Sequence, residues 1–240
     1  MIRTLIALTA FWMVQDPPKS PETKKADTEA EAFLKKVEEK ATKAKTLKCK
    51  SKLSFSQGGQ EMTFDAESSV KGDKIKLSFE GEAMGKTIQS TVTSNGSKIV
   101  AEGGFEAETK TMDAPKDLGE GVRLTLVRMG AILTMFFSDK KAKDADFSMK
   151  DLSKVSDVKF GKEEKVGDRA CKVLTFTINV KDEEKPANCK LWVDATTLAP
   201  VKRELEVEEG HTITETFSDW KLDEELKDSL FELPKEKKDK

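Results

Sequence analysis

The chain has 240 residues, and its 42 lysines and arginines against 44 aspartates and glutamates give a formal charge of −2. This length allows one large domain or two small ones, and the balance of charge argues against a nucleic-acid-binding protein, which normally has a basic surface. Hydrophobic residues make up 37% of the chain and recur too regularly for a disordered protein. The sequence has one histidine and no tyrosine, which disfavours an enzyme because histidine is the commonest acid–base group near neutral pH.

The first residues have the pattern of a signal peptide. Met1-Ile2-Arg3 precedes an apolar run over residues 4–14, which is shorter than the about 20 residues of a membrane-spanning helix. An ordinary first helix is the alternative, but Gln15-Asp16-Pro17-Pro18 would end it abruptly. We expect residues 1–15 to be removed on export to the periplasm or the medium, leaving no transmembrane segment in the mature chain.

One domain is expected between two polar segments. Residues 16–28 are rich in Pro, Lys, Glu and Ser and predict a flexible linker, and residues 235–240 predict a charged tail. Residues 29–234 show neither a second domain nor an internal repeat, and we expect a monomer. A helix begins this domain after a cap at Asp27 or Thr28. Its narrow apolar stripe consists of Phe33, Leu34, Val37, Ala41 and Ala44.

From Leu47 to about residue 95 the apolar period becomes two, which is typical of strands. Turn sequences separate the strands, and Asn95-Gly96 is the strongest hairpin signal in the chain. Each strand has one apolar and one polar face, so the sheet covers a core on one side and meets water on the other. The inward positions include Leu53, Phe55, Met62, Phe64, Ala66, Ile75, Leu77 and Phe79.

Residues 118–137 break this rhythm with apolar residues at helical spacing. They predict one long helix or two short ones, buried against the apolar face of the sheet. Arg123 and Arg128 interrupt the apolar surface and argue against a membrane-spanning helix. Either these arginines extend to the protein surface, or one of them binds strand carbonyls or a ligand head group at the mouth of a cavity.

Alternation resumes near Val155 and continues to Trp220, with acidic residues on the polar face of the strand over 201–208. In total we count about 10–11 strands, one helix before the sheet and a helical insertion at its middle. The predicted fold class is α+β, with a single large curved antiparallel sheet and helices packed on its concave face.

The final third of the chain resembles the outer-membrane lipoprotein carrier (LolA-like) family. The resemblance rests on the strand–turn–strand Leu191–Arg203, on Thr216–Trp220, on Asp228–Pro234 and, upstream, on Gly167–Leu174. It implies an unclosed β-barrel, helices that act as a lid, a periplasmic location and a cavity for a lipidic ligand or the acyl chains of lipoproteins. In these carriers a strand-borne arginine helps to latch the lid, but residues 47–110 of this chain contain no arginine.

The leading hypothesis is a periplasmic carrier or binding protein that shelters apolar chains without covalent chemistry. The alternative is an envelope sensor or interaction module that binds a protein partner on the same scaffold. We expect Met129, Leu133 and Phe136 to face the concave sheet, with Arg123 and Arg128 at the lid or mouth. The full set expected to bind the ligand is Phe55, Phe64, Leu77, Phe79, Leu126, Met129, Leu133, Phe136 and Phe176.

No catalytic residue, metal site or cofactor site is expected. His211 has no histidine or suitably spaced cysteine to complete a zinc site, and no nucleophile motif occurs. If residues 181–187 join a simple hairpin, Val180 faces Asn188, and Cys171 and Cys189 lie about 26 Å apart at about 3.3 Å per residue. A bridge between them is then excluded, whereas a bridge from Cys49 to either stays open.

Overall fold

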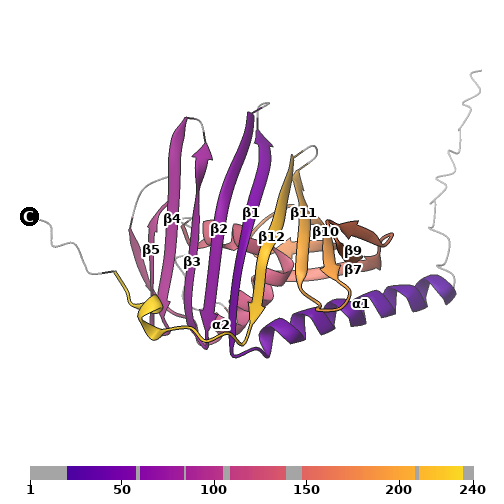
Figure 1. The fold of residues 1–240 in the computed structure, drawn as a ribbon, viewed down its shortest axis with the longest axis horizontal. Coiled ribbons are helices and arrows are strands. Elements are labelled where there is room, and N and C mark those ends of the chain that lie inside the picture. The colour runs from indigo at the N-terminus through magenta and orange to yellow at the C-terminus, as the bar shows by residue number, and fades with distance from the viewer. Residues whose placement is uncertain are drawn as a thin grey trace, which may run out of the picture.

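A twelve-stranded antiparallel sheet forms most of the protein, and helices cover one of its faces (Figure 1). The computed structural model describes residues 21–57, 60–83, 85–104, 109–138, 148–208 and 211–234. Along the sheet the strand order is β6-β5-β4-β3-β2-β1-β12-β11-β10-β9-β7, and β8 pairs with β9. The sheet is therefore open, and we call the face that the helices cover its inner face.

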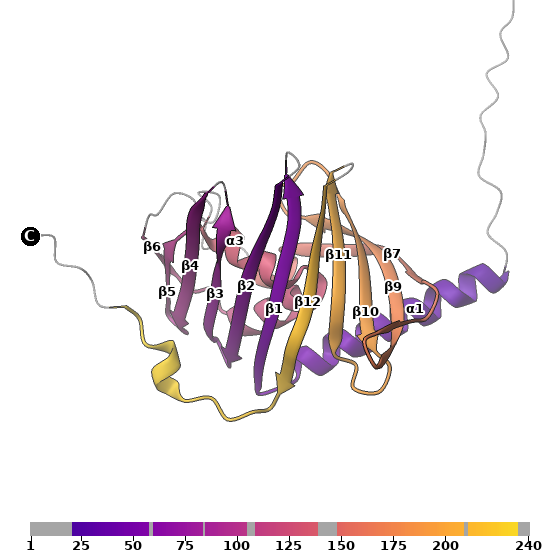
Figure 2. The same cartoon turned by 45° about the horizontal axis from the view of Figure 1, so that its top comes forward.

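The strands form two runs that are consecutive in sequence. The first half of the sheet comprises β1 (Thr46–Gln57), β2 (Gln60–Lys71), β3 (Lys74–Ala83), β4 (Lys86–Asn95), β5 (Lys98–Gly103) and β6 (Lys110–Asp113). The second half comprises β7 (Ser153–Phe160), β8 (Glu164–Val166), β9 (Arg169–Val180), β10 (Ala187–Asp194) and β11 (Pro200–Glu208). The last strand, β12 (His211–Leu222), pairs with β1 on one side and β11 on the other, and so joins the halves (Figure 2).

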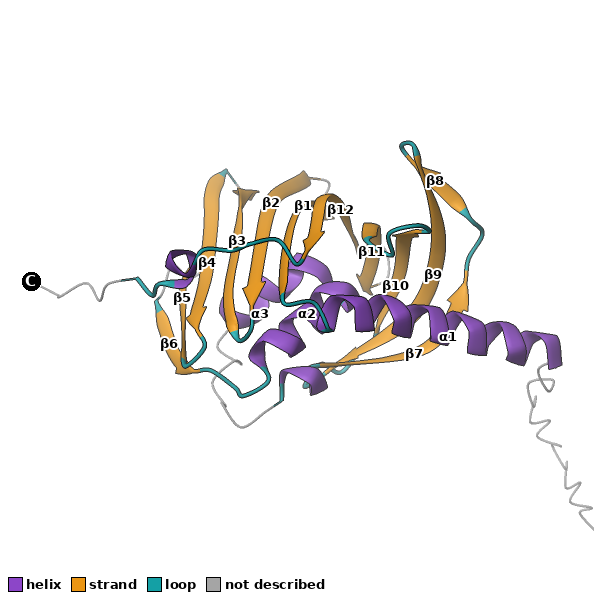
Figure 3. Ribbon diagram, turned by 60° about the horizontal axis from the view of Figure 1, so that its bottom comes forward, coloured by secondary structure: helices purple, strands orange, loops and turns teal. Residues whose placement is uncertain are grey.

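Two helical regions cover the inner face. One is α1 (Pro21–Thr42), which contacts β7 and extends beyond the sheet at its N-terminal end (Figure 3). The other comprises α2 (Leu118–Arg128), the 3₁₀-helix η1 (Gly130–Ile132) and α3 (Leu133–Ser138), which we call the helical insertion. Two further 3₁₀-helices are η3 (Met149–Asp151) and η4 (Asp228–Phe231). Within the described residues, none of these helices has the length and apolarity needed to cross a membrane.

The predicted fold class is confirmed, with differences in detail. The sequence predicted one long helix or two short ones over residues 118–137, and the structure has two short α-helices, α2 and α3. The strand total is twelve rather than 10–11, because β6 and β8 have only four and three residues and are too short to show an alternating pattern. Helix α1 begins at Pro21 rather than near Asp27, since proline is tolerated in the first turn of a helix and the lysines and glutamates that follow favour one.

The first half is a chain of hairpins whose alternation is as expected. The β4–β5 turn confirms the Asn95-Gly96 signal, because Gly96 has a φ of +94° and the Asn95 side chain accepts hydrogen bonds from the N–H groups of Ser97 and Lys98. Leu77 lies opposite Val92 across β3 and β4, and both are fully buried. Apolar side chains of successive strands thus form one continuous inner surface.

The register of the β9–β10 hairpin differs from the expected one. Ala187 pairs with Ile178 and Cys189 with Phe176, so Val180 does not face Asn188. The last residues of β9 instead pair with β7, where Val180 lies opposite Ser153, and they lengthen the connection to β10. The conclusion about the cysteines holds nevertheless, because Cys171 lies opposite Asp194, five residues from the Cys189 pair and on the other face of the sheet.

The C-terminal segment crosses the ends of the strands of the first half and ends in η4, which contacts β3 and β4 (Figure 1). Leu226 and Phe231 of this segment are buried. Lys71 donates a hydrogen bond to the Leu226 carbonyl at 2.9 Å, and Lys71 and Lys74 both pair with Asp228. The segment therefore packs on the sheet as part of the fold.

Candidate functional site

Most of the inner face belongs to one large apolar cluster that joins α1, α2 and both halves of the sheet. Of the nine residues expected to bind a ligand, Leu77, Leu126, Leu133 and Phe176 are buried in this cluster, and Met129 packs against it. Leu77 and Leu133 come from the first half and the helical insertion, whereas Phe176 lies on β9. The expected packing of the insertion on the concave face is thus present.

A second, smaller cluster lies mainly on β1, β2 and β3 and includes three stacked phenylalanines. Phe64 stacks on Phe79 with ring centroids 4.2 Å apart and on Phe55 with centroids 5.5 Å apart. Gly81, opposite Phe64, makes room for its ring, since a Cβ at this position would overlap it. Ala131 is the residue of the helical insertion that completes the cluster. We call Phe55, Phe64 and Phe79 the aromatic column.

A buried ion pair sits where the two halves of the sheet meet. Arg203 of β11 and Glu215 of β12 are only 1% and 3% exposed, and their side chains lie 2.5 Å apart. The Ser51 hydroxyl of β1 donates a hydrogen bond to Glu215 at 2.7 Å. The Arg203 guanidinium also lies 5.4 Å from the centre of the Phe217 ring, a cation–π distance.

The same ion pair holds the helical insertion. Arg203 Nη2 donates hydrogen bonds to the carbonyl oxygens of Leu126 and Val127 at 3.0 and 2.5 Å. Glu215 Oε1 accepts the N–H of Ala131 at 3.0 Å. Two carbonyls near the end of α2 and one amide of η1 are therefore satisfied by one pair of charges.

Gly130 separates α2 from η1 and lies directly on this ion pair. Its φ is +75°, a conformation that favours glycine. A Cβ at position 130 would overlap the Glu215 carboxylate and the Arg203 guanidinium. Glycine is thus required here both for the backbone conformation and for the close approach.

The two arginines of α2 bind backbone carbonyls rather than extending to the surface. Arg123 is buried and donates to the Gly72 carbonyl at 3.3 Å, in the β2–β3 turn. Burial lowers the pKa of this guanidinium, and the nearby Asp73 and Glu120 oppose that change. Arg128 donates to the Ser153 carbonyl of β7 at 2.6 Å and forms an ion pair with Glu38 of α1 at 2.7 Å. Both arginines therefore fix α2 to its surroundings.

The N-terminal end of α2 is anchored by a carboxylate. Asp117 accepts the Ser148 hydroxyl at 2.5 Å and the N–H groups of Met149 and Lys150 at 3.3 Å each. Partial burial raises the pKa of Asp117, but these hydrogen bonds outweigh it and leave the pKa below its usual value. On the same turn of α2, the Gly119 N–H donates to Asp73 at 3.1 Å.

The sequence analysis missed Arg203 and Glu215 as functional candidates. The sequence does place both charges at inward-facing positions of alternating strands. Arg203 shares a strand face with Leu205, and Glu215 lies between Ile213 and Phe217 on the same face of β12. A charge on an apolar face needs a partner. The arginine that holds the insertion therefore comes from β11 and not from the early strands. Phe136 was expected to face the sheet, but its side chain lies outside the described part of the structure.

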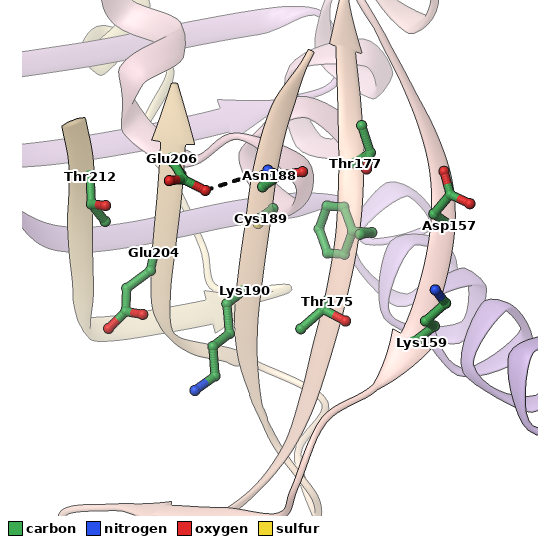
Figure 4. A pocket seen from close by; sticks show the side chains of 11 residues that line it. Asp157, Lys159, Thr175, Thr177, Asn188, Cys189, Lys190, Glu204, Glu206 and Thr212 are labelled. Carbon is green, nitrogen blue, oxygen red and sulfur yellow. Dashed lines mark hydrogen bonds between the residues drawn. The ribbon is translucent and has the colours of Figure 1, made fainter. Parts of the chain in front are cut away.

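Three hollows are lined by described residues of the sheet, and none of the three includes a residue of the helical insertion. One, of about 460 Å³, extends across the outer face from β7 to β12 and is lined mainly by polar side chains of β7, β9, β10, β11 and β12 (Figure 4). Asp157, Lys159, Glu204 and Glu206 give it charges of both signs. The others measure about 540 and 260 Å³. On the inner face, Leu126, Leu133 and Phe79 are instead packed closely.

The cysteines and the histidine form no reactive site in the described structure. Cys49, Cys171 and Cys189 are free and buried, so Cys49 has neither of the partners left open. Burial raises the pKa of the Cys49 and Cys189 thiols to about 12, so neither is a thiolate at neutral pH. His211 is exposed. The described residues contain no cluster of three His, Cys, Asp or Glu side chains that could hold a metal ion.

Comparison with protein families identifies a match over residues 30–240 to the model for a "Predicted periplasmic protein (DUF2092)". The chain belongs to this family. As a DUF2092 protein it is periplasmic, in agreement with the location that the sequence indicated. A search of curated protein sequences finds no match.

Solved structures with low sequence identity are similar to the DUF2092 chain. The lipoprotein LppX of Mycobacterium tuberculosis is 12% identical, with 81% of this chain and 96% of that chain covered and a TM-score of 0.46. A LolA superfamily protein from Nitrosomonas europaea is 14% identical, with coverage of 85% and 97% and a TM-score of 0.36. MucB of Pseudomonas aeruginosa, in its complex with MucA, is 14% identical, with coverage of 86% and 61% and a TM-score of 0.39. Each of these likenesses is distant and concerns the fold alone.

Proposed function

We propose that the protein is a non-enzymatic periplasmic carrier or binding protein for a lipidic ligand. In this proposal apolar chains bind between the inner face of the sheet and the helical insertion, which acts as a lid. The residues proposed to contact the ligand are those expected from the sequence: Phe55, Phe64, Leu77, Phe79, Leu126, Met129, Leu133, Phe136 and Phe176. Arg123 and Arg128 hold the lid at its mouth.

One observation supports the proposal most directly. The buried Arg203–Glu215 ion pair forms hydrogen bonds with the backbone of the lid and so holds it on the apolar face. A helix that served only as core would gain as much stability from apolar side chains, because two charges lose their hydration when they are buried. Arg203 and Glu215 instead fix the orientation and position of the insertion over the aromatic column. Such polar contacts can break and re-form, whereas the apolar surface below suits an acyl chain as well as a helix.

Binding would exchange one buried apolar surface for another. The ligand covers the inner face that the lid leaves, and so replaces the area that the lid had removed from water. The net affinity then depends on the difference in free energy between the state in which the lid covers the inner face and the state in which the ligand covers it. No bond is made or broken, and the ligand leaves when the lid returns.

The direct test is native mass spectrometry, with lipid extraction, of protein purified from the periplasm. A carrier yields one bound lipid class, and the emptied protein then takes up a fluorescent acyl probe such as dansyl-undecanoic acid. Recovery of no lipid together with no uptake of the probe contradicts the proposal. Co-purification of one stoichiometric protein, without lipid, would support the sensor or interaction module instead.

The Leu133→Asp variant tests the role of the lid. Leu133 is fully buried on the inner face, and an unpaired carboxylate there costs several kcal/mol, on the order of 3–5. We expect probe binding to be abolished while the far-ultraviolet circular dichroism of the strands changes little. Leu133→Met, which keeps volume and polarity, is the control and should bind the probe. Unfolding of the whole protein by Leu133→Asp would mean that the insertion is permanent core.

A further inference from the structure

The inner face of the sheet reaches solvent at the corner where α1 passes beside the edge strand β7 (Figure 3). Phe160 of β7 lies opposite Leu174 of β9, which is buried in the large apolar cluster, so both side chains are on the inner face. Of the large apolar side chains in the described residues, Phe160 alone is exposed, at 39%. Phe33 of α1 lies with its ring centroid 5.7 Å from that of Phe160 and also packs against the large cluster. The apolar interior is therefore continuous with an exposed aromatic pair.

The attachment of α1 does not require this exposed pair. The helix is already held by an ion pair with α2 and by buried apolar side chains: Ala30, Leu34, Val37 and Ala41. An exposed ring adds little to such packing, because stabilisation comes from the apolar surface that is removed from water. Exposed apolar surface of this kind is suited to contact with a ligand.

A lysine lies over both rings of the pair. Lys172 shares the inner face of β9 with Leu174 and Phe176. Its ammonium group lies 5.2 Å from the centre of the Phe33 ring and 5.6 Å from the centre of the Phe160 ring, which are cation–π distances. In the described part of the chain, Lys172 forms no ion pair with a carboxylate.

Two other lysines of the sheet lie over an aromatic ring, and both are paired with a glutamate. Lys190 and Lys202 flank Trp192 on the outer face, with ammonium groups 4.4 and 4.6 Å from the ring centre. Their ion pairs measure 3.0 and 2.6 Å. Lys172 has the aromatic neighbours but lacks the carboxylate, so its charge is complementary to an anionic group from outside.

The hollow of about 260 Å³ beside β8 has room for such a group. Its charged lining comprises Lys165 and Lys172 together with Glu163 and Glu164. Glu164 is already bound to a lysine and a tryptophan of β10. Two lysines and one remaining carboxylate therefore line the hollow, and one anionic group would balance the charge.

We propose that Phe33, Phe160 and Lys172, which we call the head-group site, bind the charged end of a single-chain anionic amphiphile, a long-chain carboxylate. The carboxylate pairs with Lys172, and the first carbons of the chain lie on the two rings. The rest of the chain follows the inner face of β9 toward Phe176, about 13 Å from Lys172 along the strand. This inference rests on the function proposed above and specifies the class of its ligand.

A single chain fits the head-group site better than a membrane surface does. Proteins that lie on bilayers insert several apolar side chains beside a basic patch. In the described residues, the exposed large apolar surface at this corner is limited to Phe160 and its partner ring. The hollow beside it also contains Glu163, which an anionic bilayer would repel.

Titration calorimetry of the delipidated protein with oleate and with oleyl alcohol, both below their aggregation concentrations, tests the site. Lys172→Met should weaken the binding of oleate about fivefold and that of oleyl alcohol less than about twofold, because only the carboxylate pairs with the lysine. Lys172→Arg should restore oleate binding to within about twofold. Phe160→Ser should weaken both ligands by a similar factor, since it removes apolar contact. The matched control Lys190→Met, on the outer face, should leave both affinities unchanged.

The outcomes separate the head-group site from the carrier function. Equal effects of Lys172→Met on the two ligands, or equal effects of Lys172→Met and Lys190→Met on oleate, overturn the site while binding still supports a carrier. If neither ligand binds the wild-type protein, the carrier function is contradicted and the site falls with it. Binding to phosphatidylglycerol vesicles that Lys172→Met abolishes, without binding of dissolved oleate, would replace the single chain by a membrane surface and so overturn the proposal.

Discussion

The inner face of the sheet differs between the two halves. In the second half, β9 and β10 present large aliphatic and aromatic side chains, such as Leu174, Phe176 and Leu191, and the neighbouring helices are α1 and α2. In the first half, stacked phenylalanines lie beside buried serines and alanines; α2 contacts β2 and β3 here too, and η1 and α3, which total nine residues, contact β2 to β5. The second half is covered by α1 and α2, whereas the first half is covered by α2 and by the short segment that follows the break at Gly130.

This difference indicates two roles for one continuous sheet. Large side chains packed against a long helix form a core whose loss would unfold the protein. Small side chains under a short segment bury less area in each contact, which under the proposed function lowers the cost of replacing the segment with an acyl chain. The Arg203–Glu215 pair lies between the halves, on β11 and β12, where it binds the backbone of both α2 and η1.

The largest expected effect comes from breaking the ion pair at this boundary. Glu215→Leu leaves the Arg203 charge buried without its partner and should lower the free energy of unfolding by about 3–5 kcal/mol. Replacing both residues, with Arg203→Met and Glu215→Leu, should recover most of this loss because no charge remains buried. Urea unfolding measures both variants. Equal destabilisation by the single and the double change would show that the two charges do not stabilise each other.

The next effect separates backbone conformation from crowding at Gly130. Gly130→Ala should lower the free energy of unfolding by about 3 kcal/mol, of which roughly 1–2 come from the left-handed backbone and the rest from displacing the ion pair. Gly167, in the β8–β9 turn of the second half, has a φ of +59°, and a Cβ added there would meet no atom within 4 Å. Gly167→Ala should therefore cost only about 1 kcal/mol. Similar losses would mean that the crowding at Gly130 relaxes freely.

A smaller, pH-dependent effect is expected at the fixed end of α2. Asp117→Asn should lower the free energy of unfolding by about 1–2 kcal/mol at pH 7, because hydrogen bonds to the carboxylate are weakened. The folded pKa of Asp117 is lowered, so its stabilisation is fully present above the unfolded pKa of about 4 and is lost as the pH falls through the folded value. Unfolding at pH 7 and pH 3 should show the difference between variant and wild type shrinking at low pH. A constant difference would exclude the carboxylate as its source.

The smallest effect concerns the outer face of the second half. Trp192 packs with Cys171, Val173 and Val201, donates a hydrogen bond to Glu164 at 2.8 Å and lies between two lysine ammonium groups. Trp192→Phe should lower the free energy of unfolding by about 1 kcal/mol, from the area that the smaller ring leaves unburied. Binding of the acyl probe should not change. Weaker binding would place the ligand on the outer face and remove the distinction between the halves.

Much of this architecture was readable from the sequence, because long strands and amphipathic helices repeat their pattern many times. The alternation of β1–β4, the Asn95-Gly96 hairpin and the helical break of 118–137 all recur in the structure. Short elements carry too few residues for a pattern, so β6 and β8 were not predicted. The β9–β10 register depends on tertiary pairing with β7, and a bulge beside Trp192 accompanies the placement of Val201 in the outer-face cluster.

The candidate site was less predictable than the fold. Its apolar residues follow from periodicity alone, but their division into two clusters depends on which helix lies above each strand. Arg203 was visible only as a charge on an apolar face, and its partner Glu215 lies on the next strand. A sequence pattern gives the faces of strands, whereas the pairing of β11 with β12 brings the two charges together.

The pairing of β1 with β12 has a consequence for how the chain folds. These strands come from opposite ends of the domain in sequence, and contacts of such separation slow the search for the native state. Until β12 arrives, β1 and β11 are both open edges, and such edges can pair with other molecules. Each half can form its own hairpins early, but the sheet becomes continuous only when its last strand is in place. A chain cut before His211 should therefore aggregate.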